Sequence, residues 1–137
     1  MKHDFLLCGL TGWCLEILFT SLGSIRKKDM RLIGQTSVWM FPIYGTAAII
    51  RPFYHHIQKL PALIRSIIYA AGIFGFEFFS GSLLKKHHLC PWDYSNVPTN
   101  INGVIRLDYA PVWMITGLIF ERVLSLKKCQ SNCQNRR

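Results

Sequence analysis

The chain has 137 residues, of which 50% are hydrophobic and only 17% are charged, and its net charge is +9. Soluble domains carry about 25% charged residues on average, so charge is depleted in this sequence. Its high hydrophobicity excludes an intrinsically disordered chain, which has too few apolar side chains to bury. Its basic residues flank apolar blocks instead of forming one continuous stripe, and this argues against nucleic acid as a partner.

Four apolar stretches approach the length of about 20 residues that a helix needs to cross the hydrocarbon core of a membrane. Only helices and closed barrels satisfy the backbone inside lipid. The sequence therefore predicts an all-α integral membrane bundle of four transmembrane helices over residues 1–126, followed by a polar basic tail at 127–137. A soluble protein with buried core helices is the disfavoured alternative, because the apolar runs are long and continuous. The expected spans are residues 5–23, 33–50, 66–84 and 109–126.

The second expected span is short and contains Pro42 and Gly45. These residues predict a kinked or partly re-entrant segment, whose freed backbone groups need neighbouring helices or water as partners. Four spans place both termini on one side of the membrane. That side carries nine Lys and Arg residues and the other carries seven, so the positive-inside rule favours cytoplasmic termini.

Three acidic residues, Glu16, Glu77 and Glu121, fall within the expected spans. Ionisable residues inside a membrane are energetically costly and usually face the interior of the bundle. Each one belongs to a stripe of small and polar residues spaced by three or four positions, so each stripe lies on one helical face. The stripes are Gly9, Gly12, Glu16, Thr20 and Gly23; then Ser66, Ala70, Glu77, Ser80 and Gly81; then Gly117, Glu121 and Ser125.

These acids have a functional and a structural interpretation. In the functional one, they line an interior that binds a cation, a proton or a polar headgroup. In the structural one, a protonated or Arg-paired Glu joins two helices. The sequence leaves both interpretations open for Glu16 and Glu77, whereas the position of Glu121 near a span end favours the structural one.

A loop rich in aromatic and polar residues follows the third expected span. It contains Trp92, Asp93, Tyr94 and Asn102, and its Pro and Asn-Gly positions are turn formers. Such side chains beside a membrane can present hydrogen-bonding groups to a headgroup or a substrate. Anchoring of the loop by the aromatic rings and capping by Asp93 is the structural alternative. The predicted substrate-binding residues are Glu16, Glu77, Trp92, Asp93, Tyr94 and Asn102.

Motifs for catalysis and metal binding are missing from the sequence. The five Cys residues contain no Cys-x-x-Cys pair. The chain also has no phosphate-binding glycine loop, no nucleophile elbow and no zinc-protease motif. We therefore expect no enzymatic activity, no metal and no cofactor, and any ATP-driven step would need a separate subunit.

Six blocks of sequence resemble the family of putative ABC-transporter type IV proteins, also called CmpB-like. The resemblance extends over residues 9–123 and looks closer to the animal branch called transmembrane protein 229 than to the bacterial branch. It implies a multi-pass membrane protein and little about chemistry. The blocks are residues 12–16 (GWCLE), 36–39 (TSVW), 43–46 (IYGT), 77–81 (EFFSG), 90–95 (CPWDYS) and 107–110 (LDYA).

Two functions remain open from the sequence. The first is permease-like handling of a small or lipid-like substrate at a site built around Glu16 and Glu77. The second is a non-catalytic membrane adaptor or assembly factor, which the small size and the small-residue faces favour. In either case the expected partners are the lipid bilayer and other membrane proteins or further copies of the chain.

Overall fold

The computed structural model describes the backbone of residues 2–26 and 28–134 and the side chains of residues 2–25 and 28–125. The chain divides into two compact units, Met1–Ile50 and Arg51–Arg137. Most of the described backbone is helical, as the sequence predicts. The three longest helices have 25 residues each and run over Lys2–Arg26 (α1), Ala62–Lys86 (α4) and Ala110–Gln134 (α5).

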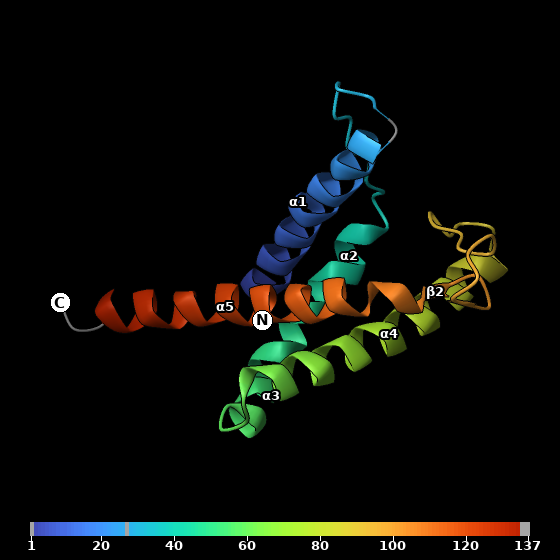
Figure 1. Cartoon of the computed structure of the whole chain (residues 1–137). Helices are drawn as coiled ribbons and strands as arrows, with labels where there is room; N and C mark the ends of the chain where they lie inside the picture. Colours follow the sequence, from blue (N-terminus) through green and yellow to red (C-terminus); the bar gives the residue numbers. More distant parts are fainter. Residues whose placement is uncertain (1, 27, 135–137) are drawn as a thin grey trace. The chain divides into compact units, whose positions relative to one another are not determined.

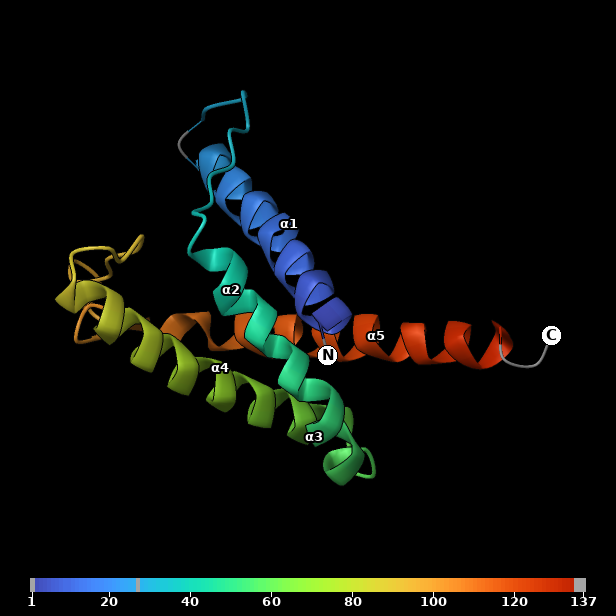
Figure 2. The same cartoon turned by 180° about the vertical axis from the view of Figure 1, so that it is seen from behind.

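The first unit pairs α1 with the short helix α2 (Met40–Gly45), and Figures 1 and 2 both show the two side by side. Glycines permit this close approach. A Cβ atom at Gly9 would lie 2.8 Å from the ring of Phe41, and one at Gly12 would collide with Tyr44. The first part of the predicted glycine stripe on α1 is therefore a helix-packing surface, as is usual for small residues.

The helix expected from about residue 33 begins only at Met40. Residues 32–37 have no regular secondary structure, and a 3-10 turn, η1 (Thr46–Ile49), separates α2 from the helix α3 (Ile50–Ile57). Pro42 occupies the third position of α2, where its missing N–H is not needed by the helix. The predicted break of the helix is present as the 3-10 turn directly after Gly45, whereas the extended stretch before Met40 is not predicted and re-entrance into a membrane stays a prediction.

In the second unit, α4 and α5 pack antiparallel, with Tyr69 of α4 lying over Gly117 of α5. Figures 1 and 2 show these two helices side by side. The face of α4 that the small-residue spacing selects is the buried one. Phe120 and Leu124 fill the core from α5, at 2% and 3% exposure. The buried residues of α4 are Ser66, Tyr69, Ala70, Glu77, Ser80 and Gly81.

The connection from α4 to α5 contains a small antiparallel hairpin, which the sequence does not predict. Its strands are β1 (Asn100–Ile101) and β2 (Ile105–Arg106). Asn102 and Gly103 at its turn have positive φ angles of 54° and 68°, the conformation that Asn and Gly tolerate best. A 3-10 turn, η2 (Leu107–Tyr109), then leads into α5.

Two helices are long and apolar enough to cross a membrane, over Lys2–Ile25 and Ala62–Lys86 of the described residues. Only 17% and 28% of their most apolar windows are buried, whereas the core helix of a soluble protein is mostly buried. Large apolar side chains cover their outer faces, including Leu18 and Leu22 on α1 and Ile67 and Phe79 on α4. Contiguous exposed apolar surface of this kind is compatible with a membrane protein.

Candidate functional site

Glu77 lies on the buried face of α4. It is 9% exposed, and its Oε2 atom has no hydrogen-bond partner among the described residues. The indole of Trp113 on α5 interacts with this carboxyl group, yet its buried Nε1–H also lacks a hydrogen bond of normal geometry within the described part of the chain. Since folded proteins pair nearly all buried polar groups, this acceptor and this donor form a position that can bind a polar group.

Small side chains continue the buried face of α4 beyond Glu77. The Ser80 hydroxyl donates to the Phe76 carbonyl at 2.7 Å and is thus satisfied within the helix. A Cβ atom on Gly81 would lie 3.1 Å from the indole of Trp92, so the glycine provides the space that this ring fills. Trp92 of the loop therefore packs at Gly81 on the face of α4 that carries Glu77, about one helical turn from that acid.

Glu121 is held by a structural ion pair. Arg65 donates from Nη2 to Oε1 at 2.9 Å and from Nε to Oε2 at 3.0 Å, and the Tyr69 hydroxyl donates to Oε2 at 2.6 Å. The side chains of Arg65 and Glu121 are only 16% and 12% exposed. Two parallel bonds from a guanidinium give a strong, oriented contact. This geometry supports the structural interpretation of Glu121, with Arg65 as its partner.

Glu16 belongs to a row of polar side chains on α1 that hold the extended segment at residues 33–37. Its Oε2 accepts a hydrogen bond from the Thr36 hydroxyl at 2.7 Å. The Thr20 hydroxyl exchanges two bonds with the backbone of Gln35, at 2.9 and 3.0 Å. Trp13 Nε1 donates to the Ser37 carbonyl at 3.1 Å. The polar residues Glu16 and Thr20 of the predicted α1 stripe therefore bind the 33–37 segment of their own unit.

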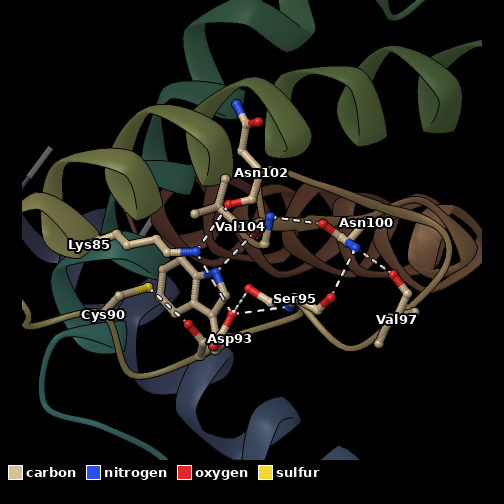
Figure 3. Close-up of polar contacts among 10 residues, drawn as sticks. Lys85, Cys90, Asp93, Ser95, Val97, Asn100, Asn102 and Val104 are labelled. Carbon is tan, nitrogen blue, oxygen red and sulfur yellow. Dashed lines mark hydrogen bonds and ion pairs between the residues drawn. The ribbon is translucent and has the colours of Figure 1, made fainter.

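Trp92 fixes the start of the loop against the hairpin. Its Nε1–H donates to the carbonyl of Val104 at 3.0 Å, and the thiol of Cys90 donates to the Trp92 carbonyl at 3.1 Å. Val104 is 1% exposed. Figure 3 shows these contacts beside the end of α4. The indole thus links the loop and the hairpin to the helix, which is a structural role for this predicted binding residue.

Asp93 and Asn102 are joined by Lys85 (Figure 3). The Lys85 ammonium donates to the Asn102 carbonyl at 3.1 Å and lies 3.9 Å from Asp93 Oδ1. Asp93 Oδ1 also accepts from the Ser95 amide and hydroxyl, at 3.0 and 2.6 Å. These bonds from Ser95 lower the pKa of the Asp93 carboxyl, with a smaller effect of the Lys85 charge. The loop therefore presents a carboxylate whose outer side is open to solvent.

Tyr94 packs edge-on against Tyr109, with 5.9 Å between ring centroids. Arg106 stacks over the Tyr109 ring at 4.4 Å and forms an ion pair with Asp108 at 2.7 Å. Its bonds hold the pKa of the Asp108 carboxyl at about 2, and Thr99 donates to the same carboxylate at 2.9 Å. This network ties the hairpin to the beginning of α5.

The structure brings the predicted loop residues together at the end of α4, and Glu77 lies on the same helix. Glu16 belongs to the first unit, so a joint site with Glu77 stays a prediction. Trp113 is not among the predicted binding residues, although its place in the expected fourth span, a membrane helix, indicates that its indole N–H needs a partner inside the protein. The sequence predicts an Arg-paired Glu without selecting Arg65, and Arg106 and Thr36 carry no pattern that distinguishes them.

No three His, Cys, Asp or Glu side chains gather to form a metal site among the described residues. The polar basic tail predicted at residues 127–137 lies entirely outside the described side chains. Backbone is described through residue 134 and continues the helix α5 up to Gln134.

Comparison with known proteins gives one result on the family and one on the fold. No solved structure matches the chain. The sequence profile of the family described as "Putative ABC-transporter type IV" matches residues 4–135, nearly the whole chain. The chain therefore belongs to this family.

Proposed function

We propose that this protein is a multi-pass integral membrane protein that handles a small or lipid-like substrate in the manner of a permease. The observation that carries the proposal is the buried pair of Glu77 Oε2 and Trp113 Nε1–H, which lack hydrogen-bond partners within the described residues. A charged carboxylate in the middle of a membrane costs about 3 kcal/mol on insertion scales. An acid this costly whose Oε2 atom has no hydrogen-bond partner among the described residues is well placed to bind cargo.

The membrane arrangement we propose has four spans. A helix of 25 residues, such as α1, α4 or α5, is about 37 Å long and exceeds the hydrocarbon thickness of about 30 Å. The broken helical stretch through α2, η1 and α3 supplies the remaining span, and both termini face the cytoplasm. The similarity of residues 90–95 to the animal transmembrane protein 229 branch supports a place in that branch.

The chemistry of the Glu77 position defines the cargo class. A carboxylate oxygen accepts a hydrogen bond or attracts a cation, and an indole N–H only donates. Three kinds of group can interact with the carboxylate and also accept a hydrogen bond from the indole N–H. They are a proton carrier, a hydrated cation and the hydroxyl of a polar headgroup. The chain carries no nucleophile or metal motif, so we propose transport or binding without enzymatic conversion and without a cofactor.

The test is flux through purified full-length protein in liposomes. A pH-sensitive dye, a potassium-sensitive dye and a fluorescent phospholipid report the three cargo classes. We expect wild-type protein to move one of them and Glu77→Gln to reduce that flux by about tenfold or more, because the variant removes the charge and keeps the shape. Equal flux of wild type and variant for all three cargoes would overturn the proposal.

A matched control separates loss of function from loss of folding. Asp29→Asn changes an exposed acid whose ion pair with Arg31 lies in a loop, and its flux should equal that of wild type. Trp113→Phe keeps an aromatic ring at this position and removes the indole N–H donor. It should therefore lower the flux of the same cargo that Glu77→Gln affects. Each variant is compared at equal content of monodisperse protein.

A second candidate function, a membrane adaptor, is favoured by one specific observation. Gly72 and Gly75 lie on the exposed side of α4, and a Cβ atom at either position would meet nothing within 4 Å. Small residues on an open helix face are typical of surfaces that pack against another membrane helix. Crosslinking in native membranes tests this function, since Gly75→Leu should then abolish a crosslinked protein partner without changing flux.

A further inference from the structure

The extended segment at residues 33–37 lies along α1 over nearly half of the helix. Its contacts begin at Ser24, whose hydroxyl donates to the Ile33 carbonyl at 3.2 Å, and end at Trp13, which donates to the Ser37 carbonyl at 3.1 Å. Eleven residues of helix correspond to about 16 Å along the axis. If α1 crosses the bilayer, irregular backbone therefore reaches about the middle of the hydrocarbon core.

The outer edge of this segment lacks hydrogen bonds. Among the described residues, the amide N–H groups of Gly34, Thr36 and Val38 donate to no backbone or side-chain acceptor. Gln35 and Thr36 are exposed, and Val38 is 78% exposed. The inner edge, by contrast, is bonded to α1 through Thr20 and Trp13.

Unpaired backbone groups are not tolerated in contact with lipid. Irregular backbone at membrane depth occurs only where protein buries it or where it lines a water-filled cavity. Water is the occupant that fits the exposed polar side chains of Gln35 and Thr36. The segment is also continuous with the loop at residues 28–32, where Asp29 and Arg31 form an exposed ion pair, so a path for water begins at the membrane surface.

We propose that water enters the membrane region along residues 33–38 and reaches the carboxylate of Glu16, which is thereby accessible to ions or protons from the side of the 28–32 loop. Thr36 connects the path to the acid, because its hydroxyl donates to Glu16 Oε2 at 2.7 Å. The inference rests on the proposed membrane function only in requiring that α1 spans the bilayer. It assigns Glu16 a place on an access route, separate from the Glu77 position.

The experiment measures the reaction of single cysteines with a membrane-impermeant methanethiosulfonate reagent in liposomes. It uses the full chain with all native cysteines replaced, and reagent is added to both faces of the membrane. Gln35→Cys and Val38→Cys test the path. Met30→Cys in the loop, at 80% exposure, is the water control, and Leu18→Cys on α1, at 60% exposure, is the lipid control.

We expect Gln35→Cys and Val38→Cys to react within about tenfold of the rate of Met30→Cys, and Leu18→Cys to react about a hundredfold more slowly, because the thiolate that reacts forms in water. Glu16→Cys should also react with the reagent. Rates at positions 35 and 38 as slow as at Leu18 would overturn the inference and mean that protein covers the edge.

The outcomes separate this inference from the proposed function. Fast reaction at Leu18 would show that α1 is not in lipid, which overturns both. Slow reaction at positions 35 and 38 with preserved Glu77-dependent flux overturns only the access route. Fast reaction at those positions with no flux supports the route and contradicts the permease-like function.

Discussion

Arg65 and Glu121, 56 residues apart in the sequence, form two parallel hydrogen bonds between α4 and α5 at 2.9 and 3.0 Å. Both side chains are largely buried. Removing one partner of such a pair leaves an uncompensated charge, which costs more than the pair contributes. The pair therefore fixes the register of the two helices and makes the second unit sensitive to either residue.

Glu121→Gln should lower the free energy of unfolding by about 3 kcal/mol, because Arg65 then keeps its charge without a carboxylate partner. Thermal unfolding in detergent measures this loss. Asp29→Asn removes an exposed pair with Arg31 and should cost less than about 1 kcal/mol. Equal melting temperatures for the two variants would contradict a structural role of Glu121.

Gly117→Ala should also destabilise the second unit, by about 2 kcal/mol, because its Cβ would overlap Tyr69 and overpacking of a filled interface is costly. Gly72→Ala on the open side of α4 makes no such contact. That variant should raise stability slightly, since Ala is the better helix former. The two single-methyl changes thus have opposite predicted signs, and a denaturant titration in detergent distinguishes them.

The helical face of α4 could be predicted from the sequence because its small and polar residues recur every three or four positions. The partner of that face could not. Trp113 lies 36 positions beyond Glu77 in the sequence, and nothing local to either residue indicates that the two side chains interact. Arg65 and Glu121 are 56 residues apart in the sequence. For the same reason, the sequence does not indicate which of the cations near span ends is the partner of Glu121.

The segment at residues 33–39 could not be predicted from its hydropathy. It belongs to an expected span that is apolar as a whole, although it contains the polar run Gln35, Thr36 and Ser37, and hydropathy does not distinguish a helical from an extended backbone. The local conformation is decided by hydrogen bonds to α1, such as the exchange between Thr20 and Gln35, and these depend on tertiary packing. By contrast, Asn102 and Gly103 were recognisable as a turn, because few residues accept positive φ angles.

The Arg106–Asp108 pair predicts a pH dependence of the hairpin. The pKa of Asp108 is lowered to about 2 by its bonds from Arg106, whereas an unfolded Asp has a pKa of about 3.9. A lowered pKa means that the stabilisation is fully present above the unfolded value and is lost as the pH falls through the folded value. Protection of the amides of residues 99–108, measured relative to their intrinsic exchange rates, should therefore fall between about pH 4 and pH 2, and Asp108→Asn should remove this dependence of the protection.

Trp92→Phe separates anchoring from substrate binding. The variant keeps an aromatic ring over Gly81 and removes the bond from Nε1 to the Val104 carbonyl. Loss of that bond should cost about 1 kcal/mol and increase amide exchange in the hairpin. Unchanged flux would then assign Trp92 to the structure of the loop. Reduced flux with unchanged amide exchange in the hairpin would instead indicate that Trp92 contacts the substrate.

Replacement of Glu77 should change stability and flux in opposite directions. Replacing a buried acid that has an unsatisfied oxygen by an apolar side chain of similar size removes a desolvation cost, so Glu77→Met should raise the free energy of unfolding by about 1–2 kcal/mol. The same variant should abolish the flux that depends on the carboxylate. Opposite changes of this kind are typical of residues retained for function at the expense of stability. Thermal unfolding and liposome flux on one preparation test both predictions, and a destabilised Glu77→Met would show that the carboxyl group holds α4 and α5 together.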